Sequence, residues 1–113
     1  MRTQATVFVG KEGQTEYYAM FLDEKFTSYS VEDGSNITHI VEDFAGRVLR
    51  HRDCLKVEVG VQFLSGLKIV DKEPVSVEQL SYERAEHLGK ALQSRLTTLL
   101  PQGERIFPME EMN

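Results

Sequence analysis

The 113-residue chain has one cysteine, three prolines, no tryptophan and no long apolar run uninterrupted by charge. A lone cysteine, Cys54, excludes a disulfide framework within the chain, so we expect a reducing compartment such as the cytoplasm. Residues 1–20 lack the unbroken apolar core of a signal peptide, and we expect neither export nor membrane insertion. Cations are also in deficit: 13 Lys and Arg against 18 Asp and Glu give a formal net charge of −5. This balance argues against general nucleic-acid binding, which needs a basic face.

Hydrophobic residues make up 41% and charged residues 27% of the chain, a mixture typical of a folded globular domain. The length predicts a single domain, which we place at residues 1–100. Residues 101–113 contain two prolines and a glycine, which predicts a loop-like, acidic C-terminal tail. Four apolar residues lie within this tail, and we expect them to pack on the domain or on a partner: Ile106, Phe107, Met109 and Met112.

Alternating apolar residues predict strands in the first third of the chain. Residues 3–9 alternate between an apolar and a mixed side, and two glycines in residues 10–13 then predict a turn. Residues 16–22 are apolar on both sides, which favours a strand in a hairpin. The same residues also fall in pairs four apart, so a helix capped by Thr15 is the alternative. Residues 26–31 alternate again and predict a third strand.

Two segments have helical periodicity, one in the middle of the chain and one toward its C-terminus. After a cap at Ser35 or Asn36, apolar residues recur at intervals of three and four, which predicts a helix ending near Arg50. A second helix is predicted over residues 77–100, with a capping box formed by Ser76 and Gln79. Its apolar stripe includes Leu92, just as the first stripe includes Phe44, and we expect both side chains to be buried.

The longest alternation in the chain predicts a fourth strand over residues 55–64. The pair Ser65-Gly66 suits a two-residue hairpin turn, with residues 67–70 returning as a fifth strand. The predicted order is therefore βββαββα. This order indicates an α+β fold in which an antiparallel sheet of about five strands carries both helices on one face.

Aromatic residues are concentrated in residues 17–29. Two helices cover only one face of the predicted sheet, so a strand that is apolar on both sides leaves an uncovered apolar face, which is typical of interfaces. Packing of all these aromatics in the core is the alternative. We therefore predict binding of another protein, including a second copy in a homodimer, through residues of the aromatic hairpin and the tail: Tyr17, Tyr18, Phe26, Tyr29, Ile106 and Phe107.

A possible anion site is the second hypothesis. The glycine loop at residues 10–15 contains Lys11 and Thr15, which could hold a phosphate, although its spacing is not that of a Walker loop and a plain turn is favoured. A basic cluster near the end of the first predicted helix could assist, and cations are also common at helix C-termini. The candidate anion-binding residues are Lys11, Thr15, Arg47, Arg50 and Arg52.

The chain has little that points to catalysis or metal binding. It contains no Gly-x-Ser-x-Gly elbow, and His51 and Cys54 resemble half a zinc site without a second close pair. We predict no catalytic residue, no metal and no cofactor. The leading hypothesis is a small non-enzymatic interaction protein of inhibitor, adaptor or accessory type. A nucleotide- or phosphate-binding protein, or an enzyme that uses the loop and the basic cluster, is the alternative.

Overall fold

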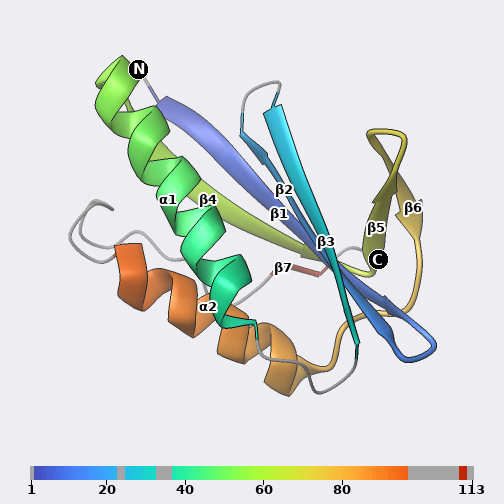
Figure 1. Ribbon diagram of the computed structural model, residues 1–113. Coiled ribbons are helices and arrows are strands. Elements are labelled where there is room, and N and C mark those ends of the chain that lie inside the picture. The colour runs from blue at the N-terminus through green and yellow to red at the C-terminus, as the bar shows by residue number, and fades with distance from the viewer. Residues whose placement is uncertain (1, 23–24, 33–36, 97–109, 112–113) are drawn as a thin grey trace.

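The computed structural model describes residues 2–22, 25–32, 37–96 and 110–111 (Figure 1). It has the α+β architecture that the sequence predicts, with two helices on a sheet. One strand more than predicted precedes the second helix, and residues 110–111 of the tail, predicted as a loop, form a short strand. The elements are, in chain order, β1 (Arg2–Glu12), β2 (Thr15–Leu22), β3 (Lys25–Glu32), α1 (Thr38–Leu55), β4 (Glu58–Ser65), β5 (Leu67–Val70), β6 (Glu73–Ser76), α2 (Tyr82–Leu96) and β7 (Glu110–Glu111).

The main sheet has the strand order β3-β2-β1-β4-β7 and is mixed, whereas we expected an antiparallel sheet. The strand β2 pairs antiparallel with both β1 and β3, while β4 is parallel to β1 and β7 is parallel to β4. The parallel pair is possible because α1 carries the chain from β3 back across the sheet to β4, as in other helical crossovers. Strand spans follow from local alternation, but the direction of β4 depends on this crossover.

Both helices pack on one face of the sheet, as predicted (Figure 1). The alternate residues Val7 and Val9 of β1 are fully buried in one cluster with Phe44 of α1 and Leu92 of α2. The predicted burial of Phe44 and Leu92 is therefore confirmed. Neither helix of the described chain is both long and apolar enough to cross a bilayer.

Residues 15–22 form a strand, so the helical alternative is wrong. The strand pairs with β1 through a two-residue turn, in which Glu12 lies opposite Thr15 and Gly13 has φ of 62°. A positive φ at the first turn residue is what a type II′ hairpin turn requires, and glycine adopts it without steric cost. The glycine loop is thus built as a hairpin turn.

The boundaries of both helices differ from the prediction. Helix α1 continues past Arg50 to Leu55 and ends where Lys56 adopts a left-handed conformation, so the fourth strand begins at Glu58. The predicted caps of α1, residues 35–36, lie outside the described residues. Helix α2 begins at Tyr82, where the N–H of Arg84 donates to Ser81 Oγ at 3.2 Å. The proposed capping box is wrong, because Ser81 is the cap.

The segment before α2 is extended because its backbone pairs first with β5 and then with Gly66 and Lys11. The strand β6 pairs with β5 in a separate two-stranded ribbon, so Ser65-Gly66 does not join two strands of the main sheet. The next residues continue this pairing: Val77 N–H donates to the Gly66 carbonyl, and Glu78 exchanges two backbone hydrogen bonds with Lys11. These hydrogen bonds to Gly66 and to Lys11 of β1 keep the backbone extended, although the local pattern of residues 77–81 favours a helix.

Gly10 of β1 lies where this segment crosses the sheet. A Cβ at this position would lie 2.6 Å from the carbonyl oxygen of Leu67 and 2.5 Å from Cγ2 of Val77. We expect Gly10→Ala to lower the free energy of unfolding by about 1–3 kcal/mol, because backbone must move to admit a methyl group. The matched control is Gly46→Ala in α1, where the added Cβ meets only the flexible end of Arg50. Urea unfolding of both variants checks this, and equal effects would contradict the close approach.

The turn of the β5–β6 ribbon places two non-glycine residues in the left-handed region. Asp71 has φ of 51° and Lys72 has φ of 66°, as in a type I′ turn. We expect Lys72→Gly to raise the free energy of unfolding by up to about 1 kcal/mol, because it removes left-handed strain at a modest entropic cost. The same substitution at Lys90, exposed in α2, should instead be destabilising by about 1 kcal/mol. Thermal unfolding that moves both variants in the same direction would refute the strained turn.

Candidate functional site

The second face of the sheet carries apolar side chains that no described helix covers. In β1 and β2 the residues that alternate with the core point to this face, and Phe8 and Phe21 are among them. Their rings meet edge to face, with centroids 5.6 Å apart and an angle of 77°. Leu64 of β4 lies beside Phe8 in the register. All three side chains are half-buried, which shows that this face is only partly covered.

The β5–β6 ribbon borders one end of this face. Lys68 of β5 places its Nζ 5.0 Å from the centre of the Tyr17 ring and 2.7 Å from Glu12 Oε1. The hydrogen bond from the ammonium to Glu12 raises the pKa of Lys68. Because Tyr17 and Glu12 belong to the helix-free side of the sheet, these contacts place β5 on that side.

Two exposed valines extend the apolar surface onto the ribbon. Val75 lies directly opposite Lys68, and Val70 lies two residues further along β5, so both share the ribbon face that Lys68 turns toward the sheet. Val70 is 43% exposed and Val75 is 40% exposed. We refer to the combined area as the helix-free surface, formed by Phe8, Tyr17, Phe21, Leu64, Val70 and Val75.

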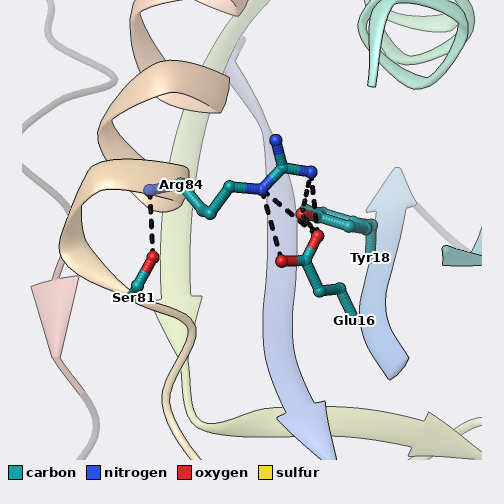
Figure 2. A network of polar contacts seen from close by, with 4 residues as sticks. All are labelled: Glu16, Tyr18, Ser81 and Arg84. Carbon is teal, nitrogen blue, oxygen red and sulfur yellow. Dashed lines mark hydrogen bonds and ion pairs between the residues drawn. The ribbon is translucent and has the colours of Figure 1, made fainter. Parts of the chain in front are cut away.

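Tyr17 and Tyr18 have opposite environments because consecutive strand residues point to opposite faces. Tyr17 lies half-buried on the helix-free surface, beneath Lys68. Tyr18 points toward the helices, is fully buried, and donates a hydrogen bond of 2.7 Å to Glu16 Oε1 (Figure 2). Burial, followed by this hydrogen bond, raises the pKa of Tyr18, so the phenol stays protonated and acts as a donor. Of the two tyrosines, only Tyr17 reaches the surface.

Glu16 is the centre of a buried polar network between β2 and α2. Arg84 Nη2 donates to Glu16 Oε1 at 2.8 Å, and Arg84 Nε lies 3.3 Å from both carboxylate oxygens (Figure 2). The same Nη2 lies 3.5 Å from the Tyr18 hydroxyl, and the bond to Glu16 raises the pKa of Arg84. The carboxylate is 1% exposed, so it is closed to a substrate. This network therefore holds the first turn of α2 against the sheet.

The remaining predicted partner-binding residues lie elsewhere. Tyr29 is on the helix-covered side of β3, where its ring centre is 5.8 Å from that of Phe44 and 5.7 Å from that of His39. Partial burial and a hydrogen bond to Asp43 raise the pKa of Tyr29. The backbone of Phe26 pairs with Phe21 in the sheet. Ile106 and Phe107 lie outside the described residues, so their role in an interface stays a prediction.

The candidate anion-binding residues are divided between two ends of the sheet. Lys11 and Thr15 lie beside the β1–β2 turn, whereas the basic half of α1 leads into β4 at the other end of β1. The nine residue-to-residue steps from Arg2 to Lys11 span about 30 Å of strand. The structure does not bring the two groups together.

Two of the three candidate arginines already have acidic partners. Arg47 Nε donates to Asp43 at 2.9 Å, and Arg52 Nη2 donates to Asp53 at 2.8 Å, while Arg50 is exposed. Partial burial would raise the pKa of Asp43, but hydrogen bonds from Arg47 and Tyr29 outweigh it and leave that pKa below its usual value. These local pairs neutralise much of the basic cluster, and we do not propose an anion site there.

Sequence reasoning missed several residues of the helix-free surface, namely Phe8, Leu64, Val70 and Val75. Phe8 and Leu64 carry a local signal, since each is a large apolar residue on the side of a strand opposite the core stripe. The ion pair of Glu16 and Arg84 has no local sequence signal, because its members lie 68 positions apart in the chain.

Within the described part of the chain, no group of three or more His, Cys, Asp or Glu side chains could hold a metal ion. No protein-family model matches the chain, and no curated protein matches its sequence.

Proposed function

We propose that this protein is a small interaction protein, of inhibitor, adaptor or accessory type, which binds another protein through the helix-free surface and carries out no chemistry. The observation that supports this proposal is the asymmetry of the sheet: one face carries both helices, and the other presents half-exposed Phe8, Tyr17 and Phe21. Aromatic side chains are enriched in protein interfaces relative to the rest of the surface.

The ribbon extends this surface in a way that suits binding. A two-stranded ribbon has little stability by itself, and this one is held at its base by Lys68 and by backbone bonds of residues 66 and 77. Its valines stay exposed although they face the sheet side. A partner that buries the exposed remainder of Val70 and Val75 would gain about 1–1.5 kcal/mol for each side chain.

The test uses one exposed position on the surface and one away from it. Val75→Glu places a carboxylate on the helix-free surface directly opposite the oppositely charged Lys68. Leu55→Glu makes the equivalent change at the end of α1, at a side chain that is also exposed. Wild type, V75E and L55E are immobilised, and proteins of the source cell that each retains are identified by mass spectrometry.

We expect a set of proteins that wild type and L55E retain and V75E loses. With such a protein purified, titration calorimetry should show binding to V75E weakened by at least about tenfold, since one buried apolar contact is lost and a charge is buried. Retention of the same proteins by all three forms would reject the helix-free surface as the binding site.

We also place the protein in a reducing compartment, because its one thiol, at Cys54, is exposed.

A further inference from the structure

The outermost strand of the main sheet, β3, presents a long and regular edge. It is eight residues long and pairs with β2 without a bulge from residue 25 to residue 32. It contains no proline. In an antiparallel strand of this kind, alternate residues direct their N–H and C=O groups away from the neighbouring strand. No other described strand pairs with these groups, and Figure 1 shows β3 at the margin of the sheet.

The other strand edges that the structure describes are shorter than β3 or partly paired. The ribbon strands β5 and β6 have four residues each, and they include Pro74 and the charges of Lys68 and Glu73. The outer edge of β4 is paired with β7 at Leu64 and Ser65, which leaves the six residues 58–63 without a described partner strand on that side. Short length, proline, charge and coverage are the usual protections of a sheet edge. In β3 the charged residues stand only at the two ends, Lys25 and Glu32, and the described side chains that it turns toward the helices, Tyr29 and Val31, are uncharged.

The hydrophobic core reaches this edge, where the described residues cover it only in part. Tyr29 and Val31 both pack against the buried core cluster, and both remain half-exposed. On the other side of the strand, Ser28 and Ser30 are exposed and small. An added strand would therefore find apolar side chains on the helix side and no bulky side chain at positions 28 and 30.

We infer that the β3 edge pairs antiparallel with β3 of a second copy of this chain. A two-fold axis perpendicular to the sheet, passing beside Tyr29, places Tyr29 opposite Tyr29 and Ser28 opposite Ser30 of the second copy. The helices of both copies then lie on the same side of one continuous sheet, and the two core edges meet. Two-fold dimers are the commonest oligomers, and here the same edge supplies both partners. This surface is separate from the one in the proposed function.

The pairing of Ser28 with Ser30 allows a test with matched charge variants. In S28K/S30K, each lysine of one copy faces a lysine of the other, and like charges directly opposite each other weaken a strand pair. In S28K/S30E, each lysine faces a glutamate instead. Both variants change the same two exposed positions, and urea unfolding establishes that each is folded.

Sedimentation equilibrium of the full chain at micromolar concentrations is expected to show a wild-type dimer of twice 12.9 kDa. The dissociation constant of S28K/S30K should rise about tenfold, whereas that of S28K/S30E should stay at or below the wild-type value. A monomeric wild type would overturn the inference. Equal dissociation constants of the two variants would also overturn it, since the register places these positions opposite each other. Neither result depends on the partner of the helix-free surface, so the two proposals fail separately.

Discussion

Replacement of Arg84 by methionine is expected to lower the free energy of unfolding by about 3–5 kcal/mol, because it leaves a charged carboxylate buried without its partner. Glu16 is 1% exposed and accepts hydrogen bonds from Arg84 and Tyr18. Methionine fills a similar volume without a donor, so the loss reports on the charge rather than on packing. Urea unfolding at neutral pH measures the difference.

The two members of this pair differ in access to water, which provides the control. The Arg84 side chain is 24% exposed and can turn its charge to solvent, whereas Glu16 cannot. We therefore expect Glu16→Gln to cost clearly less than Arg84→Met. The double variant E16Q/R84M should cost less than the sum of the single variants, since it removes both charges together. If R84M lost less than about 1 kcal/mol, the network would not be the buried ion pair described here.

Leu92→Ala is expected to lower the free energy of unfolding by about 2–5 kcal/mol, through lost apolar burial and the cavity that remains. Leu92 is 1% exposed and lies in the cluster that joins α2 to the sheet. The control is the same substitution at Leu55, near the end of α1, which is 56% exposed. We expect Leu55→Ala to change the free energy by less than about 0.5 kcal/mol. Similar losses in both variants would contradict the packing of α2.

Local periodicity was enough to predict most elements and the faces of the helices. The stripe that contains Phe44 and the stripe that contains Leu92 are both buried as predicted. The alternation in residues 3–9 likewise places Val7 and Val9 in the core. Such patterns are informative because an amphipathic helix or strand has to turn its apolar side to the interior, whatever it packs against.

The boundaries of elements depended on backbone partners that no local pattern contains. Residues 77–81 read as the start of a helix, yet Val77 and Glu78 form backbone bonds with Gly66 and Lys11. Residues 55–57 read as the start of a strand, yet α1 retains Leu55 and ends through the left-handed Lys56. At residues 77–78, hydrogen bonds to the backbone of other segments decided for an extended chain over a helix. At residues 55–57, the continuation of α1 decided for a helix end over the start of a strand.

The sequence by itself determined that the chain forms an α+β domain whose two amphipathic helices cover one face of a sheet. It left residues 16–22 open between a strand and a helix, and the pairing of β2 with β1 and β3 decided for the strand. Only the tertiary structure decided which of Tyr17 and Tyr18 reaches the surface, because neighbouring strand residues point in opposite directions and the choice depends on which face the helices occupy. It also decided the parallel pairing of β4 and the union of Glu16 with Arg84. These are contacts between segments far apart in the chain, which side-chain periodicity does not encode.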